Sequence, residues 1–453
     1  MTVKILVPSG VLGLGFSTEA LEAGLLRQPD IICIDGGSTD SGPFYLGTAT
    51  SKYSDAICRT EWKQLMKARD QLKIPLILGS CGTCGTDNMV DHIYDMTIDL
   101  AAELGHNLTI ARIYAERKNE DICTAYRDGQ IQPLAAAPPL DAEKIERFSH
   151  IVSLAGVEPL QEALQAGADI ILAGRTTDTA VIAALPLMRG MHPGASWHGA
   201  KIAECAAFCS SHPATGVILL EVDKDGFTVE PMAAGAVCTP HSVSAHMLYE
   251  NADPFILHEP GGYLDVREAD YTALDERRVR VEGSHWVKTD PYTVKLEAAS
   301  LAGYQTSMLA VIRDAHYIRN ARIWADKLVQ ICTDKTREAL GLHPKDYDLQ
   351  IRLIGVDAAL GKWEQTITTD RAVEIGVLVL ITADSQALAT EISRLVNPYL
   401  LHLPLTDNED MPTFAFPYSP AHSERGAIYE FGLNHRMVLD SPTDGFSVKL
   451  DRV

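Results

Sequence analysis

The sequence predicts an α/β fold in which helices cover both faces of a parallel sheet, followed by a smaller C-terminal α+β domain. Up to residue 114, short apolar runs alternate with helical patterns, beginning and ending on a strand. This alternation is typical of a parallel sheet, because each crossover places a helix on one face. Further along, two strands, a helix, two strands and a helix (ββαββα) favour a sheet with helices on one face. We place the first domain at 1–285 and the second at 286–453.

Apolar runs that end in turn residues mark the strands of the first domain. The expected elements up to residue 114 are strands at 3–7, 30–35, 76–78 and 108–114 and helices at 18–26, 54–72 and 91–104. Residues 133–140, P-L-A-A-A-P-P-L, are too rich in proline for a regular element and predict a linker or a long loop. The later elements are helices at 156–166, from 177 or 178, within 197–209 and at 239–249, strands at 168–173 and 217–221, and a hairpin at 223–230.

The second domain is predicted from a different order of elements. We expect paired strands at 292–299 and 305–313, a helix at 320–340, strands at 349–354 and 373–381, a helix at 386–400, and β-elements at 427–431 and 446–450. Residues 408–425 are rich in proline and turn formers and predict a loop.

A glycine-rich loop at 79–85 lies between a predicted strand and a helix start and is the most informative stretch. Glycine lets backbone N–H groups approach an anion, and the helix N-terminus adds partial positive charge. The loop residues assigned to substrate binding are Gly79, Ser80, Gly82, Thr83 and Gly85. Cys81 and Cys84 are candidate bases, because a helix N-terminus lowers the pKa of a thiol; alternatively, both are small buried side chains.

Asp35 ends a short apolar strand and is followed by a turn containing Gly36 and Gly37. The carboxyl ends of strands are where open α/β sheets bind ligands, so we assign Asp35 to catalysis and the two glycines to substrate binding. The alternative is that Asp35 orders this turn and Asp40 caps a helix. The first glycine loop, at 10–15, reads G-x-x-G-x-G and does not match the dinucleotide-binding spacing.

A second candidate loop, G-R-T-T-D-T at 174–179, follows the strand at 168–173. Arg175 lies where a carboxylate or phosphate would bind, so it is either an anion clamp, which we favour, or the partner of a neighbouring acid. Thr176 and Thr177 are assigned to substrate binding and Asp178 to catalysis, although Thr177 or Asp178 can also cap the next helix.

The balance of charges excludes several classes of partner. Lys and Arg number 39 against 60 Asp and Glu, a formal net charge of −21, so nucleic acids and anionic membranes are poor partners. The nine cysteines form no disulfide framework, and no apolar run reaches the length of a membrane span. We therefore expect a cytoplasmic protein, and the acidic surface is consistent with a homo-oligomer.

No cofactor follows from the spacing of the polar residues. Cys81 and Cys84 lack the second cysteine pair of a zinc ribbon, and His241 and His246 are five residues apart, which does not align them on one helical face. Mg²⁺ is a candidate through Asp35, Asp40 and Asp87, whose loop positions give no spacing signature.

Several motifs in one order resemble the acyclic terpene utilization (AtuA-type) family. The stretch V-S-L-A-G-V-E-P-L-Q-E-A-L-Q-A-G-A-D-I-I-L-A-G-R-T-T-D-T-A at 152–180 is similar to the glycine-rich segment of that family. H-M-L-Y-E, D-P, Y-L-D-V and Y-T-V-K-L follow in the family order, and the resemblance is most specific over 151–313. Family members usually carry an asparagine-alanine-glycine run where this chain has the loop at 79–85.

The resemblance implies an activity in the breakdown of branched terpenoid acids. A family member is proposed to cleave a 3-hydroxy-3-alkylglutaryl thioester and release acetate, which is C–C lyase chemistry. Such a reaction needs a base for the hydroxyl proton and a group that holds the developing enolate.

Two hypotheses of different classes follow. The first is an enzyme that acts on a small hydroxy-carboxylate or its acyl-CoA thioester by C–C cleavage or by proton abstraction. The catalytic candidates are Asp35 and Asp178, followed by Cys81 and Cys84, with Arg175 holding the carboxylate. The second is a non-catalytic subunit or scaffold that functions only with a partner.

Overall fold

The computed structural model describes residues 2–366 and 372–453, which form two compact units. The second unit is Leu301–Tyr429, and the first comprises the described residues up to Ser300 together with Glu430–Val453. The boundary expected at residue 285 separates domains that fold independently. Compact units are defined by contacts and not by independent folding, so this boundary stays a prediction.

The first unit is built on a sheet of ten strands in the order β13-β14-β10-β9-β1-β2-β3-β8-β4-β21. Its five central strands are parallel, with register pairs such as Ile5 with Ile31 and Asp35 with Gly79. These are β1 (Val3–Val7), β2 (Ile31–Asp35), β3 (Leu76–Gly79), β8 (Ile170–Ala173) and β4 (Thr109–Tyr114). The antiparallel strands are β9 (Ile218–Val222), β10 (Gly226–Pro231), β13 (Asp270–Ala273), β14 (Val279–Glu282) and β21 (Ser447–Arg452).

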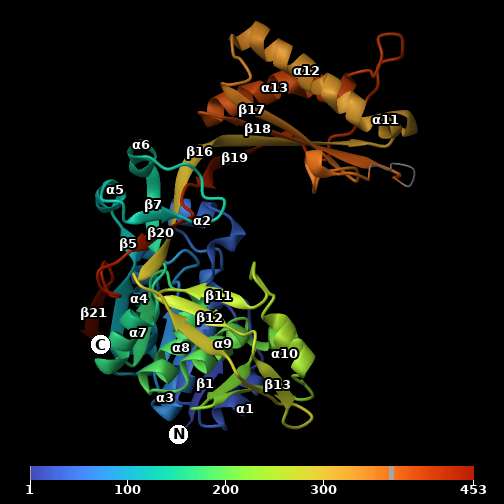
Figure 1. Ribbon diagram of the computed structural model, residues 1–453. Helices are drawn as coiled ribbons and strands as arrows, with labels where there is room; N and C mark the ends of the chain where they lie inside the picture. The colour runs from blue at the N-terminus through green and yellow to red at the C-terminus, as the bar shows by residue number, and fades with distance from the viewer. Residues whose placement is uncertain (1, 367–371) are drawn as a thin grey trace. The chain divides into compact units, whose positions relative to one another are not determined.

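Helices cover both faces of this sheet, which confirms the α/β class (Figure 1). Alternate residues of β2 show why: Ile31 and Cys33 pack in one buried cluster and Ile32 and Ile34 in the other. A strand buried on both faces consists almost entirely of apolar residues, as the run I-I-C-I does. One face is covered by α7 (Val157–Gln165), α8 (Asp178–Met188) and α9 (Pro193–Ala203), the other by α1 (Thr18–Leu25), α3 (Asp55–Leu72) and α4 (Asp87–Leu104).

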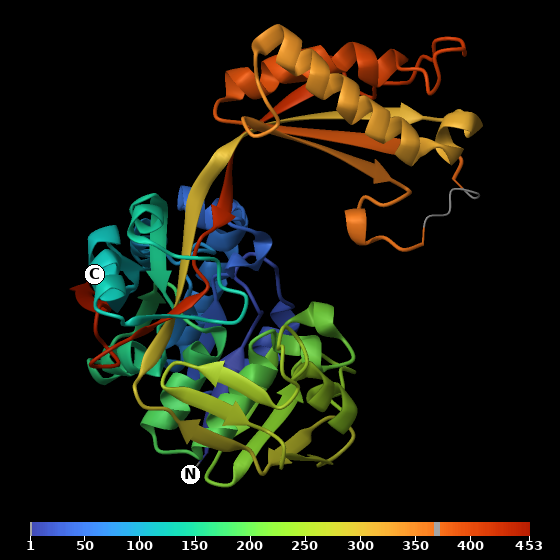
Figure 2. The ribbon, with the colours of Figure 1, turned by 45° about the horizontal axis from the view of Figure 1, so that its top comes forward.

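A small antiparallel sheet packs on α9. It consists of β11 (Ile256–Glu259), β12 (Gly262–Asp265) and β15 (His285–Lys288), drawn in yellow-green in front of the green helices in Figure 2. Trp197 of α9 stacks on Trp286 of β15 with ring centroids 4.7 Å apart. The helix α10 (Pro240–His246) begins with a capping box between Thr239 and Ser242.

The first residues of β16 (Thr293–Ile312) pair with β7 and β20. The remaining elements of the first unit are η1 (Thr39–Ser41), α2 (Phe44–Thr48), β5 (Glu116–Arg117), α5 (Asn119–Arg127), β6 (Ile131–Pro133), α6 (Ala142–Glu146), β7 (Phe148–Ser153), η2 (Ala206–Cys209), η3 (Pro213–Thr215) and β20 (His435–Val438). The expectation of paired strands at 292–299 and 305–313 is wrong, because β16 is continuous through both. The residues between the two expected strands, 300–304, are part of β16.

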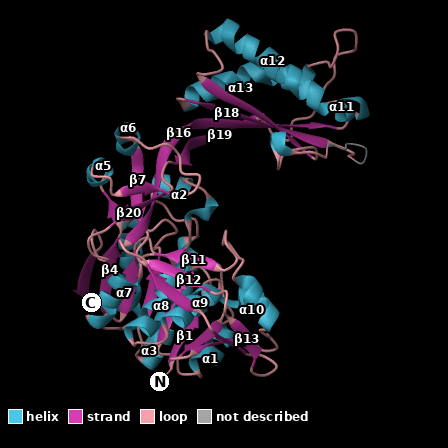
Figure 3. Cartoon of the chain, viewed as in Figure 1, coloured by secondary structure: helices cyan, strands magenta, loops and turns pink. Residues whose placement is uncertain are grey.

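The second unit is an α+β layer of helices on an antiparallel sheet (Figure 3). Alternate residues of β18 (Ile375–Ala383) are buried against α12 (Ala321–Leu340) and α13 (Gln386–His402), as the period of two in the sequence requires. The other elements are α11 (Ala315–Arg319), β17 (Tyr347–Ile354), η4 (Gly361–Trp363) and β19 (His422–Phe431), and β17 and the end of β16 flank β18. In the part of the chain that the structure describes, no helix has both the length and the apolar character needed to cross a bilayer.

Arg69 ties α3 to the amino ends of the parallel strands. Its side chain is buried and donates to Asp169 Oδ1 (2.7 Å) and to the carbonyl of Ile74 (3.0 Å). We expect Arg69→Met to lower the free energy of unfolding by about 2–3 kcal/mol, because both acceptors lose a buried, charged donor. Urea unfolding followed by circular dichroism measures the change.

Arg59→Met on the same helix is the matched control. Arg59 donates only to the exposed Glu103 (3.2 Å), and exposed ion pairs contribute little to stability. Equal unfolding midpoints for the two variants would show that Arg69 has no such role.

Candidate active site

The carboxyl ends of the parallel strands open on a cavity of about 400 Å³ within the first unit. Ser9 and Gly10 follow β1, Asp35 ends β2, and Asp178 begins the helix after β8. Strands that run in parallel end at the same edge, so residues far apart in sequence meet there. The other charged residues that line the cavity are Asp40, Lys52, Glu204 and Glu250, and its aromatic lining residues are Tyr53, Phe208 and Tyr249.

Asp35 is almost completely buried at the end of β2. The N–H of Gly37 donates to Asp35 Oδ2 (2.8 Å), whereas Oδ1 has no hydrogen-bond partner among the described residues. Burial and the charge of Asp178 hold the pKa of Asp35 well above its ordinary value, although Arg175 acts in the opposite direction. A carboxyl group in this environment keeps its proton at a pH where an exposed aspartate is ionised.

Asp178 is the first residue of α8. The Thr177 hydroxyl, and not Asp178, caps the helix by accepting from the N–H of Ala180 (3.2 Å). The Asp178 carboxyl is therefore not used as the cap, and it lines the cavity. Burial raises the pKa of Asp178, the charge of Arg175 opposes that shift, and the charge of Asp40 adds to it. Asp35 and Asp178 consequently titrate as a pair, in which the first proton leaves more easily than the second.

Further acids with raised pKa values lie next to this pair. Burial raises the pKa of Glu204 to about 8 even though the ammonium group of Lys201 donates to its carboxylate. Burial also raises the pKa of Glu259 to about 7, and its Oε2 has no hydrogen-bond partner within the described chain. The interior near the cavity therefore contains several carboxyl groups that hold protons near neutral pH.

Arg175 is the partner of an acid, the second of the two roles considered for it. Its Nε donates to Glu297 Oε2 (3.0 Å) and its Nη1 to Ser80 Oγ (3.1 Å), and all three side chains are buried. Burial alone would lower the pKa of Arg175, but the carboxylate of Glu297 raises it. Burial alone would likewise raise the pKa of Glu297, but Arg175 and Lys295 hold it at about 2. A role for Arg175 in binding a substrate carboxylate stays a prediction, and this pairing argues against it.

The loop at 79–85 connects strands rather than presenting its N–H groups to the cavity. The amides of Ser80 and Cys81 donate to the carbonyls of Gly174 and Ala173, and those of Thr83 and Gly85 donate to the carbonyls of Gly36 and Cys81. None of the residues 79–85 lines the cavity. Gly36 is needed because a Cβ there would lie 2.5 Å from the carbonyl oxygen of Ser80. The substrate-binding role assigned to this loop stays a prediction, and the hydrogen bonds of these four amides argue against it.

The thiols of Cys81 and Cys84 are unsuited to act as bases. Both are fully buried, and burial raises their pKa values, that of Cys81 well above the ordinary value. The helix N-terminus that was expected to favour the thiolate does not overcome the loss of solvation. The two cysteines therefore pack as small apolar side chains, which was the alternative interpretation of this loop.

The three aspartates considered for Mg²⁺ are not brought together. Asp87 exchanges hydrogen bonds with the Glu116 segment at the start of α4, where burial raises its pKa to about 6. In the described parts of the chain, no three His, Cys, Asp or Glu residues form a group that could hold a metal ion.

Glu297, Glu204 and Lys201 were missed by the sequence analysis. Glu297 could have been found, since it is a charged residue in an apolar strand whose neighbours Leu296 and Ala298 are buried. Lys201 and Glu204 are three residues apart, which is common on exposed helices and gave no sign that both are buried here.

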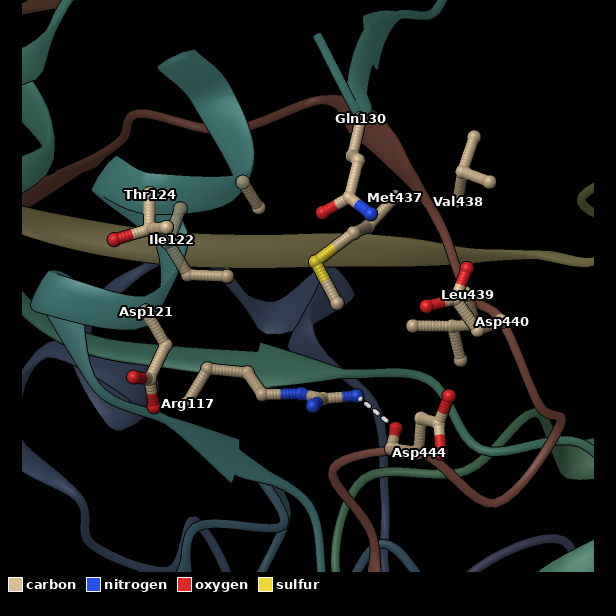
Figure 4. Close-up of a pocket in the computed structure, with 11 residues that line it drawn as sticks. Arg117, Asp121, Ile122, Thr124, Gln130, Met437, Val438, Leu439, Asp440 and Asp444 are labelled. Atoms are coloured by element: carbon tan, nitrogen blue, oxygen red, sulfur yellow. Dashed lines mark hydrogen bonds between the residues drawn. The ribbon is translucent and has the colours of Figure 1, made fainter. Parts of the chain in front are cut away.

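Another cavity of the first unit, of about 280 Å³, lies between α5 and the chain segment that follows β20 (Figure 4). Arg117 crosses it and donates to Ser153 Oγ (2.7 Å) and to the carbonyl of Asp444 (2.7 Å). Burial lowers the pKa of Arg117, and no residue predicted for catalysis lines this cavity. The cavity that contains Asp35 and Asp178 is therefore the candidate active site.

Gly85 sets the distance between the two loops behind this site. Its φ is +65°, and a Cβ would lie 2.3 Å from the backbone nitrogen of Arg175. We expect Gly85→Ala to destabilise the protein through both effects: about 1 kcal/mol from the left-handed backbone and a further 1–3 kcal/mol from overpacking. Chemical unfolding measures the loss.

Gly105→Ala isolates the backbone contribution. Gly105 has a φ of +68° at the end of α4, and a Cβ there meets no atom within 4 Å. Equal losses in the free energy of unfolding of the two variants would show that the close approach of Gly85 to Arg175 does not contribute to the destabilisation.

Comparison with known proteins identifies the family. A family model described as acyclic terpene utilisation family protein AtuA matches residues 50–416, which include Asp178 and both loops behind the site but not Asp35. No curated protein and no solved structure gives a significant match. The resemblance noted in the sequence is confirmed, and the chain belongs to the acyclic terpene utilisation family AtuA.

Proposed function

We propose that the protein is an enzyme that acts on the acyl thioester of a small branched hydroxy acid, by C–C cleavage or by removing a proton next to the carbonyl. The observation that carries the proposal is the pair of Asp35 and Asp178 in one cavity, both with raised pKa values. When two carboxyl groups share a site, their pKa values are pushed apart, so one can act as the acid and the other as the base.

The charges around the cavity favour a thioester over a free carboxylate at the reacting end. Five carboxyl groups line the described cavity, those of Asp35, Asp40, Asp178, Glu204 and Glu250, against one ammonium group, that of Lys52. The guanidinium of Arg175 is already paired with Glu297 and is not part of the lining. An uncharged thioester carbonyl avoids the repulsion that a second carboxylate would meet there.

Asp35 is suited to act as the acid. Its Oδ1 lacks a partner among the described residues, and its raised pKa keeps a proton available for donation. A protonated carboxyl that donates to the thioester oxygen stabilises the enolate as negative charge develops on that oxygen.

Asp178 is suited to act as the base. In C–C cleavage its carboxylate removes the proton of the substrate hydroxyl, the carbon bearing that hydroxyl becomes a carbonyl, and the bond to the carbon next to the thioester breaks. The electron pair of that bond forms the enolate, which then takes the proton at carbon. In simple proton abstraction, Asp178 removes the proton next to the carbonyl directly.

Asp178→Asn is expected to lower the rate of the reaction by about 10²–10⁴-fold, the usual contribution of a positioned base. The purified protein is incubated in D₂O with 3-hydroxy-3-methylglutaryl-CoA, and NMR records deuterium next to the thioester together with any cleavage product. Asp99→Asn on the exposed face of α4 is the matched control and should leave the rate unchanged. Wild-type protein without exchange or cleavage on such thioesters would favour the non-catalytic subunit instead.

Asp35→Asn is expected to stabilise the protein at alkaline pH. Because the folded-state pKa of Asp35 lies above the ordinary value of 3.8, the folded protein retains a proton that the unfolded chain has released. The free energy of unfolding therefore falls as pH rises from about 3.8 through the folded-state pKa. Asparagine cannot ionise and can still accept from Gly37, so the variant avoids this loss.

Thermal unfolding from pH 4 to pH 9 tests the direction of this pH dependence. The difference in Tm between Asp35→Asn and wild type should be small at the acidic end and grow in favour of the variant as pH rises. A variant that is less stable than wild type at pH 8 would contradict the assignment of a protonated Asp35.

A further inference from the structure

An apolar groove adjoins the candidate active site and shares a wall with it. The groove has a volume of about 840 Å³ and lies between η2, η3 and α10 in the first unit. Phe208, Pro213, Ala214 and Tyr249 line both the groove and the carboxylate-lined cavity. A molecule that reaches Asp178 from this side can therefore extend into the groove without crossing the protein interior.

The groove presents large apolar side chains to solvent. Phe208 is 52% exposed, Leu248 57% and Tyr249 38%, and the rings of Phe208 and Tyr249 meet edge to face at 6.0 Å. Scattered apolar residues are normal on a surface, but a contiguous patch beside a polar cavity marks a place for a ligand.

Contacts on the protein side hold the wall of the groove in place. The Ser242 hydroxyl of α10 donates to the carbonyl of Cys209 at the end of η2 (2.7 Å). The His246 ring stacks on the Tyr249 ring at 5.5 Å, and the Lys201 ammonium donates to the carbonyl of Tyr249 (2.9 Å). The same ammonium group donates to Glu204 in the cavity, so Lys201 connects the polar and apolar halves.

The only acidic or basic side chains in the groove's described lining are those of His241 and His246. Burial lowers the pKa of His246 to about 4, so this histidine is neutral, and the groove's described lining contains no Asp, Glu, Lys or Arg. The carboxyl groups of Asp40, Asp178, Glu204 and Glu250 belong to the adjoining cavity. The two hollows together form a surface that is polar at one end and apolar at the other.

We infer that this groove holds the apolar tail of the substrate, and that Phe208, Ala214 and Leu248 determine how long a tail is accepted. The inference rests on the proposed function, because the polar end of the substrate is the thioester that reaches Asp35 and Asp178. The occupant is an acyl chain rather than a lipid surface, since the carboxyl groups of the adjoining cavity and the net charge of −21 repel anionic membranes.

Chain-length dependence of binding tests the inference. Affinities of 3-hydroxyacyl-CoA thioesters with four, eight and twelve carbons are measured by calorimetry on the full-length protein. Each methylene that enters the groove should tighten binding by about twofold to fourfold. Ala214→Trp, at an exposed position on the wall that the groove shares with the cavity, should abolish this dependence.

Leu248→Gln supplies a second variant with a matched control. It should weaken binding of the twelve-carbon thioester about tenfold, because an amide replaces an apolar contact, whereas Leu274→Gln should have no effect. Leu274 is 49% exposed and lines neither hollow. Affinity that is independent of chain length, or equal effects of the two glutamine variants, overturns the inference.

Straight-chain alkanols distinguish failure of the groove from failure of the proposed function. Butanol, hexanol and octanol carry no thioester, so their binding, followed by calorimetry, reports on the groove alone. Length-dependent binding that Ala214→Trp abolishes supports the groove even if Asp178→Asn leaves turnover of the thioester unchanged. If alkanols do not bind and size-exclusion chromatography shows a dimer that Leu248→Gln dissociates, the groove is an interface between two copies, and the inference is wrong.

Discussion

The buried ion pair of Arg175 and Glu297 is the interaction on which the candidate site depends. Arg175 follows β8 and Glu297 lies in β16, and the same guanidinium donates to Ser80 after β3. One side chain therefore connects three segments directly behind the cavity. Removing either partner of such a pair leaves a buried charge without compensation, so the arrangement is strongly constrained.

Burial raises the pKa values of Asp35 and Asp178 despite the nearby guanidinium of Arg175. Both lie near Arg175, whose charge favours their ionised forms. Glu297 accepts from Arg175 Nε at 3.0 Å, and its own pKa of about 2 keeps it ionised. Burial is the largest cause at both aspartates, to which the charge of Asp178 adds at Asp35 and the charge of Asp40 adds at Asp178, so both pKa values rise.

The polar cavity and the apolar groove suggest how one site can combine reactivity with selectivity. Carboxyl groups that are held in a confined space change protonation state readily, which is useful for moving protons. They offer little apolar surface, so they contribute little to holding an acyl chain. An adjoining apolar surface can provide that binding energy at a distance from the reacting atoms. Tyr249 and Phe208 line both the polar cavity and the apolar groove.

Local patterns in the sequence were sufficient for most of the fold. The strands at 3–7, 30–35 and 76–78 and the helices at 54–72 and 320–340 are found within one or two residues of their expected limits. Asp35 and Asp178 could be placed at strand ends for the same reason, because parallel strands end at one edge. Some elements were missed, among them α5 and β7, and the continuous strand β16 was divided into two.

The sequence by itself determined the α/β class, the family and the edge of the sheet at which polar residues gather. These depend on hydrophobic periodicity and on motif order, which are local properties of the chain. Only the tertiary structure decided that Arg175 faces Glu297, that the donors of the 79–85 loop are already used, and that Cys81 and Cys84 lie in the core. Burial and charge pairing arise from residues more than a hundred positions apart, and no short window of sequence contains that information.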